Sequence, residues 1–265
     1  MRGRVLVVAG SDSGGGAGIQ ADIKTITALN GFAMTAVTAL TAQNSLTVAK
    51  IHKSPPEFVA EQIRVTLEDL GADAIKTGMM ADSSIIEAAA DILDEMGSRV
   101  PWVIDPVMVS TAQDRLLDED AVQSMKRRLI AHARIVTPNM AEAEVLAGIN
   151  VSTPDEMVAA GKIILDLGPS AVLITGGHFE GRILTDVLIS SDGFEYYESL
   201  RFKTRHTHGT GCTLASAIAC GLAQGLELGE AVVRARNYVS MAIRSAPGYG
   251  GGHGPLNHSH PLEPS

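Results

Sequence analysis

The sequence predicts an α/β fold with a central, mostly parallel β-sheet, helices on both faces and a small antiparallel hairpin at one edge. Short apolar, β-branched runs alternate with longer segments of helical periodicity, which is typical of repeated β–α units. Only 4% of the residues are aromatic, so small aliphatic side chains must fill a core that suits helices packed closely on a parallel sheet. Two late β-like runs flank a Ser-Asp-Gly turn, which indicates the edge hairpin.

The elements follow in a regular order along the chain. A buried strand comes first, a glycine-rich loop follows it, and Ile19, Ile23 and Ile26 then repeat at helical spacing. Core strands are expected at 5–8, 32–40, 72–75, 102–104, 133–136 and 171–174, and the hairpin at 183–189 and 194–197. Further helices are expected at 55–70, 82–93, 118–130, 139–147, 154–167, 213–223 and 230–245.

The length of 265 residues suits one large α/β domain, residues 1–265, without a linker. Residues 247–265 are rich in glycine, proline and histidine, and we expect an irregular tail there. His253, His258 and His260 cluster in this tail. They could bind a metal, but a solvent-exposed tail is the simpler interpretation.

Charge and cysteine usage exclude several kinds of partner. The formal net charge of -9 gives no gain from counterion release on nucleic acid. Cys212 and Cys220 lie about 12 Å apart along one expected helix, too far for a disulfide, and two reduced thiols suit the cytoplasm. The first apolar run is too short for a signal sequence, and no run approaches the ~18 apolar residues of a membrane helix.

Ligands of such folds bind outside the carboxyl ends of the strands, where the first loop, residues 10–18, holds five glycines in nine residues. These glycines could bring backbone N–H groups close to a ligand, or they could simply form a tight turn. The pattern Gly16-x-Gly18-x-x-Ala21 formally matches a dinucleotide fingerprint, but it begins too far after the strand and lacks the expected acid. The Gly-Lys-Ser/Thr of a P-loop is absent from the sequence.

Other strand ends carry polar or polarisable side chains. Gln43 follows the second strand, and its amide could recognise the edge of a heterocycle or could be a surface amide. Lys76 follows the third strand and could neutralise phosphate, while Met79 and Met80 could line an apolar pocket or pack in the core. Asp105 follows the fourth strand and could hold Mg²⁺ directly or through water.

The last strand ends and one helix start complete the edge. Asn139 and Glu142 share a helix face, which fits either a capping box or support for a metal. The glycine pair after Thr175 permits close approach of a nucleotide. The strongest local signal is the run from Gly209 to Thr213, because successive N–H groups at a helix N-terminus bind anions. Cys212 lies in this run, where the helix dipole is expected to lower a thiol pKa.

Together these motifs resemble the hydroxymethylpyrimidine/phosphomethylpyrimidine kinases of thiamine biosynthesis. The resemblance runs from the first strand to the tail and is specific because the motifs occur in order at strand ends. The motifs are AGSDSGGGAGIQADIKT from Ala9, TAQN from Thr41, KTGM from Lys76, DPVM from Asp105, TPN from Thr137 with Glu142, THGTGCT from Thr207 and GPLNH from Gly254.

The resemblance implies a ribokinase-like fold, a homodimer, and two ATP- and Mg²⁺-dependent phosphorylations, first of a hydroxymethylpyrimidine and then of its monophosphate. It implies an anion hole of Gly209, Thr210, Gly211 and the Cys212 amide, with Cys212 as the base of the first step. The implied substrate pocket is Gly10, Asp12, Ala17, Gln43, Met79 and Val107, and the implied nucleotide-binding residues are Lys76, Thr175, Gly176 and Gly177. The implied Mg²⁺ residues are Asp105, Asn139 and Glu142.

Two departures and three alternatives accompany this interpretation. Cys212 stands where related sugar kinases carry an aspartate base, and Arg205-His206 replaces an expected Lys-Asn. A pyridoxal kinase is the nearest alternative, which Gln43 disfavours. An acyl-transfer enzyme with a cysteine nucleophile would need a positioned histidine partner. A regulatory protein that has lost catalysis is disfavoured by the intact set of Asp105, Glu142 and Cys212.

Overall fold

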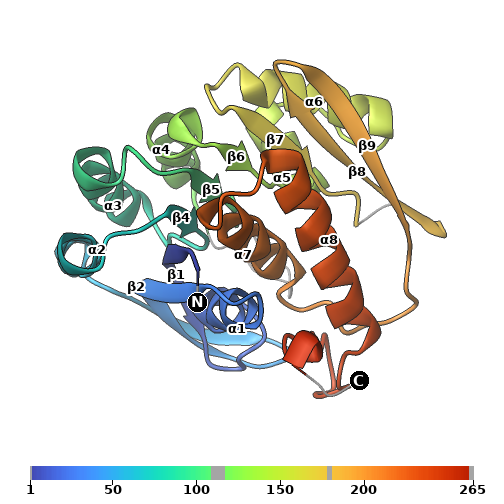
Figure 1. The fold of residues 1–265 in the computed structure, drawn as a ribbon, viewed down its shortest axis with the longest axis horizontal. Coiled ribbons are helices and arrows are strands. Elements are labelled where there is room, and N and C mark those ends of the chain that lie inside the picture. The colour runs from blue at the N-terminus through green and yellow to red at the C-terminus, as the bar shows by residue number, and fades with distance from the viewer. Residues whose placement is uncertain (1, 109–116, 178–180, 263–265) are drawn as a thin grey trace.

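The computed structural model describes residues 2–108, 117–177 and 181–262, which form a sheet covered by helices on both faces (Figure 1). Within these residues the sheet has nine strands in the order β3-β2-β1-β4-β5-β6-β7-β8-β9. Neighbours from β2 to β7 pair in parallel, whereas β3 at one edge and β8 and β9 at the other are antiparallel. The strands are β1 (Arg4–Asp12), β2 (Phe32–Gln43), β3 (Val48–Lys53), β4 (Ala74–Thr77), β5 (Trp102–Ile104), β6 (Ile135–Val136), β7 (Ala171–Ile174), β8 (Ile183–Ser190) and β9 (Gly193–Leu200).

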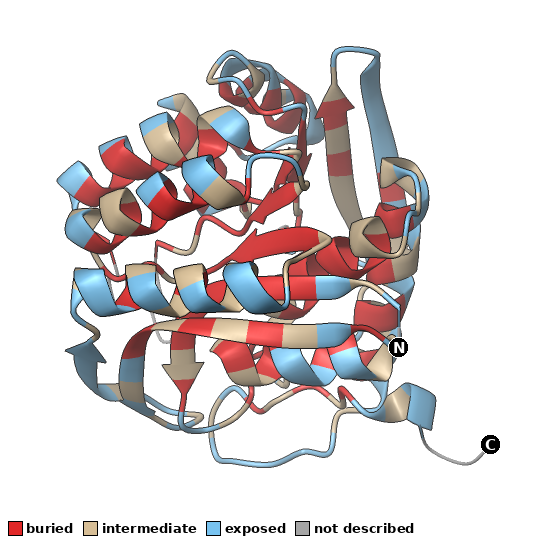
Figure 2. Ribbon diagram, turned by 60° about the vertical axis from the view of Figure 1, so that its left-hand side comes forward, coloured by how far each residue is buried: buried red, intermediate tan, exposed pale blue. Residues whose placement is uncertain are grey.

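Two apolar cores hold the helices to the sheet. On β1, Leu6 and Val8 face the core under α2 to α6, whereas Val5 and Val7 face the core under α1, α7 and α8. All four side chains are buried, which explains a strand of continuous apolar residues. Figure 2 shows the same contrast between buried strands and exposed outer helix faces. The helices are α1 (Gly18–Ala28), α2 (Pro56–Asp69), α3 (Ser83–Met96), α4 (Glu119–Arg128), α5 (Met140–Ala147), α6 (Pro154–Leu165), α7 (Thr210–Ala223) and α8 (Leu228–Arg244), with 3₁₀ turns at Ile130–His132 and His260–Leu262.

The predicted fold class is confirmed, with corrections at strand ends. The antiparallel hairpin pairs with β7, as expected, but β3 adds an unexpected antiparallel strand at the other edge. β3 carries little apolar pattern because most of its residues are exposed at the sheet edge. β2 and β4 also run further than expected, so Gln43 and Lys76 lie inside strands rather than after them. In the described part of the chain, no helix is both long and apolar enough to cross a membrane.

The segment after α8 was expected to be irregular and exposed, and the second expectation is wrong for part of it. Leu256 is 3% exposed and His258 is 5% exposed. The His258 Nε2 atom lies 3.0 Å from the Thr213 hydroxyl of α7, and the Tyr238 hydroxyl donates to the His258 carbonyl at 2.6 Å. Of the three tail histidines, only His253 is exposed as expected. The tail therefore packs against α7 and α8 without forming regular structure.

The buried imidazole predicts a specific acid sensitivity. Burial lowers the pKa of His258 to about 4. In the unfolded chain this imidazole has a pKa near 6.5, so it becomes protonated at pH values at which the folded chain keeps it neutral. Stability is therefore lost as the pH falls from about 6.5 to about 4, by up to about 3 kcal/mol. In urea titrations we expect His258→Gln to be less stable than the parent at pH 7.5 and the gap to narrow at pH 5. A gap that is the same at both pH values would contradict the assigned titration.

Candidate active site at the carboxyl edge of the sheet

The parallel register brings the expected ligand-binding segments to one edge of the sheet. The backbone N–H of Asp105 donates to the carbonyl of Thr77, and that of Thr137 donates to the carbonyl of Ile104, each at 3.0 Å. Asn139 in turn forms a parallel bridge with Thr175. The ends of β4, β5, β6 and β7 thus lie side by side, as predicted from the alternation of strands and helices.

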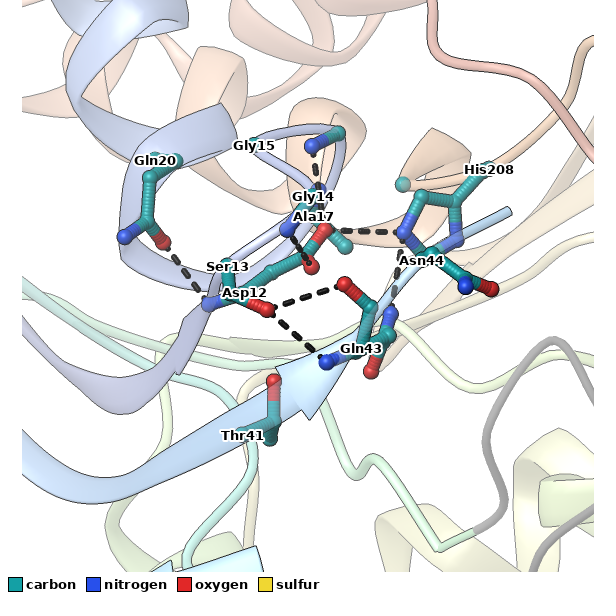
Figure 3. Close-up of polar contacts among 12 residues, drawn as sticks. Asp12, Ser13, Gly14, Gly15, Ala17, Gln20, Thr41, Gln43, Asn44 and His208 are labelled. Carbon is teal, nitrogen blue, oxygen red and sulfur yellow. Dashed lines mark hydrogen bonds and ion pairs between the residues drawn. The ribbon is translucent and has the colours of Figure 1, made fainter. Parts of the chain in front are cut away.

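The glycine-rich loop after β1 is folded around the carboxylate of Asp12 (Figure 3). Its Oδ1 accepts the N–H of Gly14 at 2.8 Å, and its Oδ2 accepts those of Gly16 at 3.0 Å and Ala17 at 2.8 Å. Burial opposes ionisation of Asp12, but hydrogen bonds from His208 and the loop amides outweigh it and lower its pKa. These three amides, which were expected to approach a ligand, therefore bind Asp12 instead. The direct contact of Asp12 with substrate stays a prediction.

The loop glycines also permit backbone segments to touch. Gly209 has a φ of 83°, and a Cβ there would collide with the Gly16 carbonyl. Gly18 has a φ of 54°, and its Cβ would collide with the Gly10 carbonyl. A side chain at Gly10 would strike the terminal methyl of Met79. The loop, the start of α7 and the expected substrate residues Gly10 and Met79 are therefore in direct contact, which only glycine allows.

His208 joins the loop to the end of β2. Its Nε2 atom lies 2.9 Å from Asp12 Oδ2 and 3.0 Å from the side-chain amide of Gln43 (Figure 3). An ionised Asp12 carboxylate can only accept, so its contact requires the histidine proton on Nε2, and the Gln43 amide then has to present its oxygen to that N–H. The sequence analysis missed this partner, whose only signal was its position in the THGTGCT motif. Contact of Gln43 with a substrate stays a prediction.

Lys76 lies in a buried ion pair. Its ammonium is 3.0 Å from Asp22 Oδ1 on α1 and 4.0 Å from Asp105 Oδ2, and its side chain is 0% exposed. The Ser216 hydroxyl of α7 also donates to Asp22, at 2.6 Å. Burial opposes the charge on Lys76, but the carboxylates of Asp22 and Asp105 outweigh it and raise its pKa. The sequence analysis missed Asp22 and Ser216, and the contact of Lys76 with a nucleotide stays a prediction.

Asn139 and Glu142 form the capping box at the start of α5. Asn139 Oδ1 accepts the N–H of Glu142 at 3.0 Å, and Glu142 Oε2 accepts the N–H of Asn139 at 2.9 Å. Burial and the nearby charge of Asp105 raise the pKa of Glu142 to about 8. Burial, despite the charge of Lys76, raises the pKa of Asp105 to about 6. The capping interpretation is confirmed, and it places a second buried carboxylate near the first.

These two carboxylates fit a hydrated divalent cation. Asp105 Oδ2 and Thr137 Oγ1 are buried and accept or donate no hydrogen bond within the described residues. A cation would satisfy such oxygens and relieve the repulsion between Asp105 and Glu142. In the described part of the chain, no three His, Cys, Asp or Glu side chains are grouped so that they could hold a metal ion. Thr137 is an oxygen that the sequence analysis did not assign.

The start of α7 faces Asp105. The helix begins at Thr210, three residues earlier than expected, with Gly209 as its N-cap. A Cβ on Gly211 would lie 3.8 Å from both carboxylate oxygens of Asp105. The N–H groups of a first helical turn lack intrahelical acceptors, and the helix dipole adds positive potential there. This turn can therefore stabilise an anion placed beside Asp105.

The Cys212 thiol does not have the low pKa that its helix position suggested. Burial raises its pKa to about 12, and the charges of Asp105 and Asp22 contribute in the same direction against Lys76. The prediction from the helix dipole is wrong because a short-range carboxylate and desolvation outweigh it. Cys212 is a neutral thiol at neutral pH in this environment.

The remaining predicted residues lie at two sides of this centre. The Val107 N–H donates to the Asp105 carbonyl at 2.8 Å, which keeps Val107 beside the carboxylate. Met79 lines a cavity of about 590 Å³, together with Ile51 and Lys53 of β3 and the segment 117–119 before α4. At the far side, the Gly176 N–H donates to Asp186 at 2.9 Å, and the Gly177 carbonyl accepts from Arg201 at 2.9 Å.

Comparison with known proteins gives consistent relatives. The sequence model of the phosphomethylpyrimidine kinase family matches residues 12–257. The hydroxymethylpyrimidine/phosphomethylpyrimidine kinase of Streptomyces coelicolor is 44% identical over 254 residues, 96% of this chain and 93% of that protein. The thiamine biosynthesis bifunctional protein ThiED of Geobacter sulfurreducens is 48% identical over 257 residues, 97% of this chain. The chain spans 52%, about half, of the length of that protein.

Solved structures of two related kinases share the fold. An ADP complex of Bacillus subtilis pyridoxal kinase superposes with a TM-score of 0.90 at 35% identity, covering 98% of both chains. A phosphomethylpyrimidine kinase from Clostridium difficile superposes with a TM-score of 0.81 at 38% identity, covering 91% of this chain and 99% of that one. These structures show the ribokinase-like fold that the sequence motifs implied.

The buried ion pair predicts a large and partner-dependent effect on stability. Lys76→Met leaves Asp22 buried without its cation, which should lower the free energy of unfolding by about 3–5 kcal/mol. The double variant Lys76→Met, Asp22→Leu should be more stable than Lys76→Met alone, because neither charge is then left without a partner. Urea unfolding of the parent, both single variants and the double variant measures this coupling. Strictly additive losses would contradict the pairing.

Proposed function

The chain belongs to the phosphomethylpyrimidine kinase family, and we propose that it phosphorylates 4-amino-5-hydroxymethyl-2-methylpyrimidine and then the resulting monophosphate, using ATP. The observation that carries this proposal is the first turn of α7 facing the buried carboxylate of Asp105. A kinase needs anion-stabilising donors beside a metal-binding carboxylate, and this edge of the sheet supplies both. The product of the second step is the pyrimidine diphosphate used in thiamine biosynthesis.

The first step needs an acceptor for the hydroxyl proton. The substrate oxygen bonds to the γ-phosphorus while the bond from phosphorus to the ADP oxygen breaks, and the N–H groups of Gly211 and Cys212 stabilise the equatorial charge. We assign the proton to the Cys212 sulfur. A neutral thiol must first pass its own proton to an acceptor, and we assign this proton to the carboxylate of Asp105, whose charge acts on the thiol. The second step needs no such base, because its nucleophile is an ionised phosphate.

Mg²⁺ would be held by Asp105 and Glu142 and their waters, with Asn139 and Thr137 beside them. The buried oxygens of Asp105 and Thr137, which have no hydrogen bond within the described residues, support this assignment. When bound, the ion would neutralise charge on the transferring phosphates. Burial raises the pKa of both carboxylates, so a cation bound here would have to displace a proton from Glu142 at neutral pH.

The nucleotide would border Thr175, Gly176 and Gly177. Asp186 supports the Gly176 amide, and the Arg236 guanidinium binds Asp186 at 2.8 Å, which fixes this segment from α8. The ADP complex of the related pyridoxal kinase supports an adenine nucleotide as the phosphoryl donor. Lys76 would act on the nucleotide through its charge, because its ammonium is buried against Asp22.

The pyrimidine ring would lie near Gly10, Ala17, Gln43, Met79 and Val107. The close contact of Gly10 with Met79 supports a flat apolar floor, and Asp12 would support this pocket by holding the loop. We also propose one kinase domain that acts as a homodimer in the cytoplasm. Two unpaired cysteines suit a reducing compartment. Exposed apolar side chains of β2 and β3, Phe32, Leu40 and Ile51, offer a surface for a second copy.

The function and the role of Cys212 can be tested together. A coupled ATPase assay with Mg²⁺ should show turnover of hydroxymethylpyrimidine and of its monophosphate, with pyridoxal as the competing substrate. Cys212→Ala should lower kcat of the first step by about 10²-fold or more and that of the second by less than ~10-fold, because only the first needs a base. Equal kcat values in parent and variant would leave only the backbone amide of Cys212 in catalysis. Turnover of pyridoxal alone would replace the proposed substrate.

The cation assignment predicts a change in Mg²⁺ dependence. Asp105→Asn removes a charged ligand and should raise the Mg²⁺ concentration for half-maximal rate by about 10-fold or more. Asp91→Asn on the surface of α3 is the matched control and should change nothing. Rates measured across a Mg²⁺ series with constant free ATP separate the two. An unchanged Mg²⁺ requirement in Asp105→Asn would place the cation elsewhere.

A further inference from the structure

Residues 254–258, here the closing segment, lie against both the glycine-rich loop and the start of α7. At its start, the Gly254 carbonyl accepts the N–H of His208 at 3.1 Å, and His208 and Pro255 form a parallel bridge. Pro255 also packs on the glycine-rich loop, where a Cβ on Gly16 would lie 3.1 Å from the Pro255 Cβ. The segment therefore contacts both the loop on Asp12 and His208, which lies two residues before the start of α7.

The other end of the closing segment reaches the first turn of α7 through two hydroxyl contacts. The Thr213 hydroxyl donates to the Gly209 carbonyl at 2.8 Å, and the Thr213 N–H donates to the same carbonyl at 2.9 Å. With the hydroxyl proton directed at Gly209, the His258 ring, 3.0 Å away, can donate from Nε2 to the Thr213 oxygen. The result is a directed chain from imidazole to hydroxyl to the N-cap carbonyl.

His258 is itself held rigidly from α8. Its carbonyl accepts the Tyr238 hydroxyl at 2.6 Å, and the preceding Asn257 N–H donates to the Ala242 carbonyl at 3.0 Å. Leu256 is 3% exposed and already supplies the apolar anchor of the segment. A buried imidazole adds little to such an anchor and costs desolvation, so its contact with Thr213 needs another explanation.

We infer that His258 is a positioning residue for phosphoryl transfer. It fixes the Gly209 carbonyl and thereby the direction of the first N–H groups of α7. Gly209 has a left-handed φ of 83°, which the helix that follows does not impose on it. Hydrogen bonds in series strengthen one another, so the His258 contact tightens the Thr213 contacts to this carbonyl. Small displacements of such donors cost rate because they act on charge that develops only during transfer. The inference rests on the proposed function.

The test compares His258→Ala, His258→Gln, Thr213→Val and Thr213→Ser with the parent. His258→Ala and Thr213→Val should each lower kcat of both phosphorylation steps by about 10- to 100-fold, with KM for the pyrimidine changed less than ~3-fold. The amide N–H of His258→Gln and the hydroxyl of Thr213→Ser should restore most of the rate. The double variant His258→Ala, Thr213→Val should be no slower than the slower single variant. His253→Ala, exposed in the same tail, is the control and should match the parent.

A second measurement separates this inference from the proposed function. Hydrogen exchange of the N–H groups of residues 210–213 should quicken in His258→Ala and not in His253→Ala, whatever the substrate is. If the parent protein phosphorylates no pyrimidine, the proposed function is overturned, and this exchange result still tests whether His258 fixes the start of α7. Normal kcat in His258→Ala, or strictly additive losses in the double variant, would overturn the positioning role. Slow rates in His258→Ala that His258→Gln does not restore would also overturn it.

Discussion

The buried charge balance between Lys76, Asp22 and Asp105 is the constraint on which the site depends. Lys76 lies in the middle of the sheet with no exposed surface, so its charge requires a carboxylate within the protein. Asp22 supplies it from α1, and Ser216 of α7 binds the same carboxylate, so one ion pair ties two helices to β4. The ammonium is 1 Å closer to Asp22 than to Asp105 (3.0 Å against 4.0 Å). Asp105 is therefore only partly neutralised by Lys76.

The glycines of the glycine-rich loop serve a different purpose from the one that the sequence suggested. Glycines near a strand end suggested amides that approach a ligand, yet Asp12 accepts hydrogen bonds from three of those amides. The glycines are needed because the loop passes so close to Gly209 and Gly10 that a Cβ would not fit. In the proposed function, anion binding falls instead on the first turn of α7, which this tightly folded loop contacts.

Sequence patterns predicted the layers and the convergence of strand ends because these follow from apolar periodicity and from the parallel register. They also pointed to Asp105, Glu142 and the start of α7, which the structure brings close together. They missed Asp22, whose position in an amphipathic helix gives no sign of a partner 54 residues away. They assigned Cys212 a lowered pKa because the helix dipole is visible in sequence, whereas burial beside Asp105 is not. The docking of His258 was missed for the same reason, since a Gly- and His-rich segment has the composition of an exposed tail.

The contacts of the closing segment have a consequence for the order in which the site can form. Synthesis supplies Asp12 and Gly16 early, but their neighbours His208 and Pro255 follow about two hundred residues later. Contacts of such sequence separation carry a large loop-closure cost and form late in folding. A nascent chain can therefore assemble its sheet while the first turn of α7 still lacks its contact with the closing segment. Competence for phosphoryl transfer would then arise at the end of folding rather than grow gradually with it.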